Sequence, residues 1–129
     1  MFPIVLTLSE NPVVVDAVRW FCDELSTLSA KATAWILPVY LGFVLTAEDP
    51  RDPRPTEFLI YELGPASEHE EETRTRLALL NGDQLEALRL MIEYWKDDPY
   101  WSEYCPEELD RAAGFLAGLE AGRRTTGRT

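Results

Sequence analysis

Residues 81–95, NGDQLEALRLMIEYW, form the stretch that decides the fold prediction. Asn81 is a good hydrogen-bond acceptor at a helix N-terminus, and Gln84 follows at the spacing of a capping box. Apolar residues then recur at intervals of three and four, which places them on one face of a helix. The members of this face are Leu85, Leu88, Ile92 and Trp95, with Met91 beside them. This stretch therefore predicts an amphipathic helix with one buried face.

Two further helices are predicted before this segment. Asn11–Pro12 marks the start of a helix over about 12–25, because proline lacks only a donor that the first turn leaves unpaired. A second helix, over about 29–47, is capped by Ser26 or Ser29. This second helix is apolar on most sides, as expected for the central element of a bundle.

The segments between the predicted helices are rich in proline or in charge. Residues 48–55, EDPRDPRP, contain three prolines and are predicted to be a loop. Residues 57–63, EFLIYEL, fit either a strand or a short helix, and their helical neighbours favour the helix. Residues 66–76, ASEHEEETRTR, have no apolar anchor and predict a mobile acidic loop.

A last helix is predicted to begin at Pro106 and to stop at Gly122. The fold class that follows is all-α, as a compact bundle of four main helices with one further short helix. Residues 4–8, IVLTL, are predicted to form an extended N-terminal segment. Residues 1–122 are predicted to form a single domain, and residues 123–129, RRTTGRT, a flexible basic tail.

Aromatic and acidic residues concentrate in residues 93–109, EYWKDDPYWSEYCPEEL. The two flanking helices account for most of this stretch and leave the linker 97–104, DDPYWSEY, to be explained. Trp101 is suited to seal the junction between the helices, whereas Tyr100 and Tyr104 exceed that need. The predicted partner-binding residues are Tyr100, Trp101, Tyr104, Asp97, Asp98 and Glu103.

The net charge limits the kind of partner. The chain has 12 basic and 23 acidic residues, for a formal charge of −11. Residues 1–122 hold nine of the basic residues and all 23 acidic ones, for −14. Such a field repels phosphate backbones, so we expect no nucleic-acid binding through the body of the protein. The charge either attracts a basic partner or keeps the protein soluble, and the sequence leaves both explanations open.

No motif for catalysis, metal binding or cofactor binding is visible. The chain contains no nucleotide-binding loop, nucleophile elbow or zinc-protease motif. Residues 68–72, EHEEE, offer one histidine among adjacent carboxylates, which rarely converge on one ion, so neither a metal nor a cofactor is expected. Two distant cysteines, Cys22 and Cys105, do not make a disulfide framework. No catalytic residue is assigned, and the enzyme alternative requires a pocket lined by Tyr40, Tyr61, His69 and Cys105.

A membrane segment is not expected. The longest uncharged run, from Ala32 to Ala47, has sixteen residues, fewer than the roughly 20 that a spanning helix needs. No signal peptide is visible, because the first positive charge is Arg19. These features predict a cytoplasmic protein.

Three stretches, in this order, resemble a known family: KATAWILPVYLGFVL, EFLIYEL and LALLNGDQLEALRLMIEYW. The family is an uncharacterised bacterial group of small acidic helical proteins, catalogued as a domain of unknown function. It carries an LPAYL-like segment in a central helix and an LTPEQ-like helix cap, where this chain has Asn-Gly in place of Thr-Pro. The resemblance covers about residues 28–119 and implies a helical fold without an assigned activity. The matching residues are Leu37, Pro38, Tyr40, Leu41, Leu80, Asn81, Gly82, Asp83 and Gln84.

The predicted function is that of a non-enzymatic module that binds a basic protein, as immunity proteins and toxin inhibitors do. This prediction is an analogy in charge, size and fold class. Its physical part is that an acidic surface steers a basic partner and exposed aromatic rings hold it. A structural homodimer that uses the same aromatic residues is the remaining alternative, and light scattering separates the two.

Overall fold

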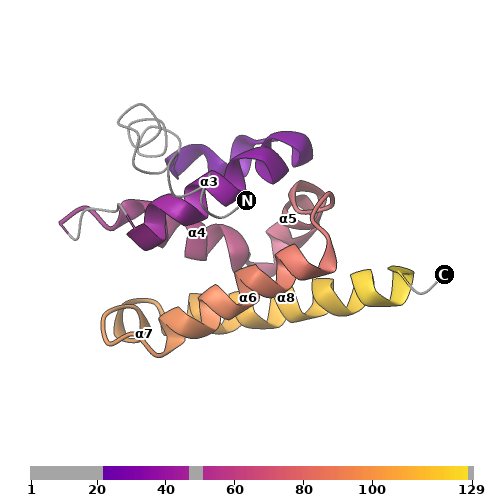
Figure 1. Cartoon of the computed structure of the whole chain (residues 1–129). Helices are drawn as coiled ribbons and strands as arrows, with labels where there is room; N and C mark the ends of the chain where they lie inside the picture. Colours follow the sequence, from indigo (N-terminus) through magenta and orange to yellow (C-terminus); the bar gives the residue numbers. More distant parts are fainter. Residues whose placement is uncertain (1–21, 47–50, 128–129) are drawn as a thin grey trace. The chain divides into compact units, whose positions relative to one another are not determined.

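The computed structural model describes residues 22–46 and 51–127 (Figure 1). Every regular element in these ranges is a helix, so the all-α prediction is confirmed for the described part of the chain. The predicted segment at 4–8 and most of the predicted helix at 12–25 lie outside it. The contacts divide the chain into two units, Met1–Leu59 and Ile60–Thr129.

The described part of the first unit centres on helix α3, Ala30–Thr46, which confirms the helix predicted over about 29–47. The hydroxyl of Ser29 accepts a hydrogen bond from the backbone N–H of Ala32 at 3.1 Å, which is the predicted N-cap. A 3₁₀ helix, η1 (Cys22–Thr27), precedes α3. Tyr40 of α3 is fully buried, and its hydroxyl donates to the backbone carbonyl of Pro55 at 2.5 Å.

Residues 57–63 are helical, which resolves the alternative that the sequence left open. Helix α4 spans Arg54–Leu63 and thus begins inside the predicted loop at 48–55. In the second unit, α4 is followed by Gly64, where a Cβ atom would lie 2.5 Å from the backbone oxygen of Glu108. Only glycine permits this close approach of the two backbones, which brings the end of α4 onto the last helix.

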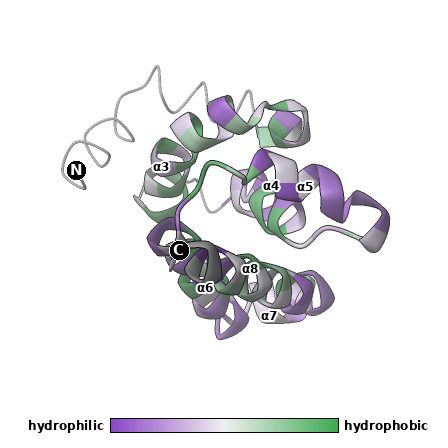
Figure 2. Ribbon diagram, turned by 90° about the vertical axis from the view of Figure 1, so that its right-hand side faces the viewer, coloured by the Kyte–Doolittle hydropathy of each residue, from purple (hydrophilic) through white to green (hydrophobic). Residues whose placement is uncertain are grey.

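The prediction of a mobile loop at 66–76 is wrong. This segment forms a 3₁₀ turn, η2 (Ser67–His69), followed by helix α5 (Glu70–Arg76), whose residues are mostly hydrophilic (Figure 2). Three glutamates occupy the first turn of α5 and two arginines the last, which is the charge order that a helix dipole favours. The segment has no apolar residue to anchor it, which is why the sequence predicts a loop, but Thr73 is buried and serves in that place.

Helices α6 (Gly82–Lys96) and α8 (Pro106–Gly127) form the main body of the second unit. They lie side by side, and the four-residue helix α7 (Trp101–Tyr104) connects them at one end (Figure 1). Polar contacts pair the start of one helix with the end of the other, so the two run antiparallel. These contacts join Lys96 to Asp110, Arg89 to Glu120, and Arg123 to the backbone carbonyl of Leu80.

The predicted amphipathic helix at 81–95 is confirmed as α6. Asn81 and Gln84 form the full capping box, with each side chain accepting from the other's backbone N–H at 2.9 Å. The face predicted to be apolar is buried and has matching buried positions on α8. The buried side chains are Leu85, Leu88, Ile92 and Trp95 on α6, and Leu109, Ala112, Leu116 and Leu119 on α8.

The start predicted for the last helix is correct and its end is wrong. Helix α8 begins at Pro106 but continues past Gly122 to Gly127. The Arg123 side chain donates to the carbonyls of Leu77, Ala78 and Leu80 at 3.1, 3.1 and 2.9 Å. These bonds hold the helix against the turn before α6 and outweigh the helix-stopping tendency of Gly122. The predicted flexibility of residues 123–129 stays a prediction.

None of the helices in the described ranges combines the length and the apolar character that crossing a membrane requires.

Candidate functional site

The candidate site lies where α7 connects α6 to α8. We call it the aromatic corner and define it by the six residues predicted from the sequence. The carboxylate of Asp98 accepts hydrogen bonds from the backbone N–H groups of Tyr100 at 3.0 Å and Trp101 at 3.1 Å. These bonds start the short helix and bring the aromatic residues to one end of the helical hairpin (Figure 1). The six residues are Asp97, Asp98, Tyr100, Trp101, Glu103 and Tyr104.

The three aromatic rings of the corner form one ordered cluster. Tyr100 and Tyr104 stack with their ring centroids 5.5 Å apart and an interplanar angle of 12°. Trp101 meets both rings edge-on, at 4.8 Å from Tyr100 and 6.0 Å from Tyr104. The spacing of four residues along the chain brings the two tyrosines onto the same side of the turn.

Exposure separates the tryptophan from the tyrosines. Trp101 is only 7% exposed and therefore belongs to the core, which agrees with the sealing role predicted for it. Tyr100 and Tyr104 are 51% and 53% exposed. Trp101 thus supports the tyrosines from the inside, while the stacked pair presents ring surface to the solvent.

The acidic residues of the corner also divide into two kinds. Asp98 is engaged by the backbone, as described above. Asp97 and Glu103 are exposed and make no ion pair with any described side chain. The nearest base along the chain, Lys96, is shared between Glu93 at 4.0 Å and Asp110 at 3.2 Å. The corner therefore combines exposed tyrosine rings with negative charge that the described residues leave unneutralised.

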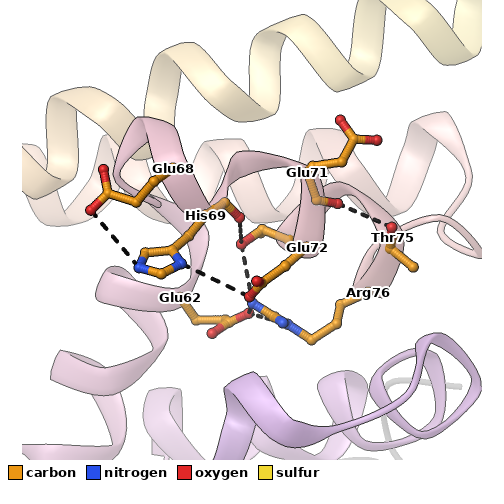
Figure 3. Close-up of polar contacts among 8 residues, drawn as sticks. Glu62, Glu68, His69, Glu71, Glu72, Thr75 and Arg76 are labelled. Carbon is orange, nitrogen blue, oxygen red and sulfur yellow. Dashed lines mark hydrogen bonds and ion pairs between the residues drawn. The ribbon is translucent and has the colours of Figure 1, made fainter.

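The charged side chains around His69 form an exposed cluster. Figure 3 shows the imidazole between two exposed carboxylates, with Nε2 at 4.0 Å from Glu68 and Nδ1 at 3.9 Å from Glu72. Within the described residues, no three histidine, cysteine, aspartate or glutamate side chains are grouped so that they could hold a metal ion. The cluster is a surface feature of η2 and α5.

Beside this cluster, the Glu62–Arg76 pair links α4 to α5 (Figure 3). Arg76 donates from Nε to the Glu62 carboxylate at 2.6 Å and from Nη2 to the hydroxyl of Thr73 at 3.1 Å. Both charged side chains are mostly buried. Burial raises the pKa of the Glu62 carboxyl above its ordinary value of 4.5, against the opposing attraction of Arg76. Sequence reasoning missed this pair, because its members are fourteen residues apart.

The residues named for the enzyme alternative are divided between the two units. Tyr40 belongs to the first unit, where its hydroxyl bonds to Pro55. In the second unit, His69 is exposed on η2, whereas Cys105 is buried at the end of α7. A pocket does exist in this unit, on α5 and α8, and none of the four predicted residues lines it.

Comparisons with known proteins give no further assignment: no family model, curated protein or solved structure matches the chain. The resemblance to the bacterial family therefore stays a prediction from the sequence.

Proposed function

We propose that this protein is a non-enzymatic, acidic protein-binding module that captures a basic protein through the aromatic corner, in the manner of immunity proteins and toxin inhibitors. The observation that carries the proposal is the stacked pair Tyr100–Tyr104, exposed beside carboxylates that make no ion pair with the described side chains. Tyrosine rings supply large contact area at low entropic cost, and their faces attract guanidinium and ammonium groups.

The negative charge supports the same kind of partner. A formal charge of −11 produces a long-range field that accelerates the approach of a basic protein. Asp97 and Glu103 place part of that charge next to the rings. An arginine or lysine of the partner can therefore face a carboxylate while its stem or guanidinium packs on Tyr100 or Tyr104.

Three further proposals come from the sequence. We propose that the chain folds as a compact bundle of four main helices with an extended N-terminal segment, that it belongs to the bacterial family described above, and that it is located in the cytoplasm.

The test compares two double variants that remove exposed apolar surface of similar extent. Tyr100→Ala/Tyr104→Ala deletes the stacked pair, and Leu79→Ala/Leu90→Ala deletes side chains that are 60% and 54% exposed elsewhere in the same unit. Proteins captured from the host lysate by each variant are identified by mass spectrometry, and thermal melts verify that both variants are folded. We expect the wild type and the leucine variant to capture the same basic protein and the tyrosine variant to lose it.

The association rate of the purified pair supplies a second test. We expect it to fall about tenfold or more between low and high salt, because screening removes the steering. A partner without excess positive charge, or an association rate that does not change with salt concentration, would contradict the proposal. If light scattering shows a wild-type dimer that the tyrosine variant converts to a monomer, the corner is a homodimer interface instead.

A further inference from the structure

A pocket of about 420 Å³ lies in the second unit, away from the residues of the aromatic corner. Its walls come from α5 and from the connection after α4, and its floor is one side of α8. The volume falls within the range of small-molecule sites, and the lining mixes charged and apolar groups. The residues that bear on its chemistry are Glu70, Arg74, Arg111, Gly114, Phe115 and Gly118.

Arg111 is held in place while part of its hydrogen-bonding capacity stays open. Its Nε donates to the backbone carbonyl of Gly64 at 3.2 Å, which tethers this exposed side chain at the edge of the pocket. Its two terminal nitrogens make no hydrogen bond to any described residue. A guanidinium that is tethered through Nε and has two open amino groups matches the two oxygens of a carboxylate.

The floor of the pocket exists because two residues of α8 lack side chains. A Cβ atom added at Gly114 or at Gly118 would meet no atom within 4 Å, so no neighbouring group requires glycine there. Glycine inside a helix is unfavourable by up to about 1 kcal/mol relative to alanine. Here the two glycines leave the open volume in which a ligand can approach the helix backbone.

An apolar surface adjoins the charged groups. The ring of Phe115 lines the pocket, and the guanidinium of Arg74 lies 5.6 Å from its centroid. Pro65 and Leu119 complete this side. A flat apolar group therefore fits beside Phe115 while a charged group reaches Arg111.

The charge of the lining selects the anion. Arg74 and Arg111 bring two positive charges, and Glu70, which pairs with Arg74 at 3.4 Å, brings one negative charge. The lining thus has a net charge of about +1, and Glu71 just outside it also pairs with Arg74 at 3.1 Å, so one carboxylate at Arg111 suits this site better than a doubly charged phosphate. We propose that this pocket binds a carboxylate attached to an apolar or aromatic group. The proposal is independent of the partner proposed for the aromatic corner.

Two sources can supply this chemistry, a free small acid or the C-terminal carboxylate of a peptide with an apolar last residue. The full-length protein is titrated with 3-phenylpropionate, with its neutral analogue 3-phenylpropanol, and with a tetrapeptide ending in phenylalanine, in free and amidated forms. Backbone NMR signals of Gly114 and Gly118 report binding at the floor. The signal of Gly122, which follows at the same spacing on α8 and does not line the pocket, is the internal control.

We expect saturable shifts of Gly114 and Gly118 with the two carboxylates and none with the alcohol or the amide. A peptide that binds at least tenfold tighter than phenylpropionate assigns the site to peptide termini, and similar or weaker binding assigns it to small acids. We expect Arg111→Gln to weaken carboxylate binding at least tenfold. Equal binding of phenylpropanol, or unchanged affinity in Arg111→Gln, would overturn the proposal.

A second pair of variants tests the floor without touching a charge. Gly118→Leu fills the pocket, whereas Gly122→Leu adds the same side chain one turn further along, where a Cβ also meets no atom within 4 Å. We expect binding to be lost in the first variant and kept in the second, with both folded by circular dichroism. Binding by Gly118→Leu at the wild-type affinity would place the ligand elsewhere, and absence of saturable shifts with both carboxylates in the wild type would end the proposal.

Discussion

The aromatic corner and the segment 66–76 are both short, acid-rich connections, but they differ in whether their carboxylates are paired with basic side chains. In helix α5, Glu70 and Glu71 both pair with Arg74, at 3.4 and 3.1 Å, so these two carboxylates have a basic partner within their own helix. In the corner, Asp97 and Glu103 make no ion pair with the described side chains, and two tyrosines stand exposed beside them.

This difference shows that an acidic cluster does not by itself mark a binding surface. In α5 the carboxylates have a local explanation, because they favour the helix start and pair one turn further on. In the corner Asp98 has such an explanation, and Glu103 lies in the first turn of the four-residue helix α7, whereas Asp97 stands at the C-terminal cap of α6. Substitution of the groups that distinguish the two regions tests this difference.

The largest effect is expected inside the corner, from its buried ring. Trp101→Ala removes a large side chain that is 7% exposed, so we expect the free energy of unfolding to fall by about 4 kcal/mol. Tyr100→Ala removes a half-exposed ring and a stacking contact, which costs about 1 kcal/mol. Urea denaturation of both variants measures the difference. Equal losses would show that the tyrosines belong to the core and would remove the distinction on which the corner rests.

The next effect is expected from the buried charge that anchors α5. Arg76→Ala leaves the Glu62 carboxylate without its partner in a mostly buried position, so we expect a loss of about 3 kcal/mol. Arg74→Ala, two residues earlier, removes the exposed pairs with Glu70 and Glu71 and is expected to cost about 0.5 kcal/mol. Denaturation curves recorded side by side compare the two. A smaller loss in Arg76→Ala than in Arg74→Ala would mean that surface pairing, and not the buried link, holds this helix.

A smaller effect separates the two neighbouring aspartates of the corner. Asp98→Ala removes the acceptor for the N–H groups of Tyr100 and Trp101, which is worth about 1 kcal/mol, as for a helix N-cap. Asp97→Ala removes an exposed carboxylate that forms no ion pair in the described part of the chain, and it should change stability by less than about 0.5 kcal/mol. Thermal melts of the two variants measure this ordering. The reverse ordering would show that Asp97, and not Asp98, has the structural role.

The elements that could be predicted from the sequence are those whose signals are local. The capping box of Asn81 and Gln84, the apolar face of α6 and the start of α8 at Pro106 each depend on residues a few positions apart. The six residues of the corner could be predicted together for the same reason, since they are neighbours in the chain. Their division into a buried Trp101 and exposed tyrosines followed from counting how much apolar surface one helix junction needs.

The features that the sequence did not reveal depend on contacts between distant residues. Residues 66–76 lack apolar periodicity, and their helix is anchored by the link from Arg76 to Glu62. Helix α8 passes Gly122 because Arg123 reaches carbonyls more than forty residues earlier in the chain. The pocket on α8 combines residues from three separate stretches. Long-range polar contacts of this kind have no periodic signal in a single sequence.

The most subtle prediction concerns the pH dependence that the α5 anchor introduces. Burial raises the pKa of Glu62 in the folded protein above the value of 4.5 that applies when the chain is unfolded. As the pH rises through the range between these two pKa values, the unfolded chain releases the proton first. The contribution of Glu62 to stability therefore falls until the folded carboxyl has also ionised.

In the variant Glu62→Gln, the side chain at this position does not titrate. We therefore expect the variant to gain stability relative to the wild type as the pH increases from about 4 to neutrality, on top of a constant loss from the weakened bond to Arg76. Urea denaturation of both proteins at a series of pH values measures this difference. If the free energy of unfolding of the wild type instead increases relative to that of Glu62→Gln as the pH rises, the attraction of Arg76 outweighs burial. The Glu62–Arg76 pair would then behave like an exposed ion pair.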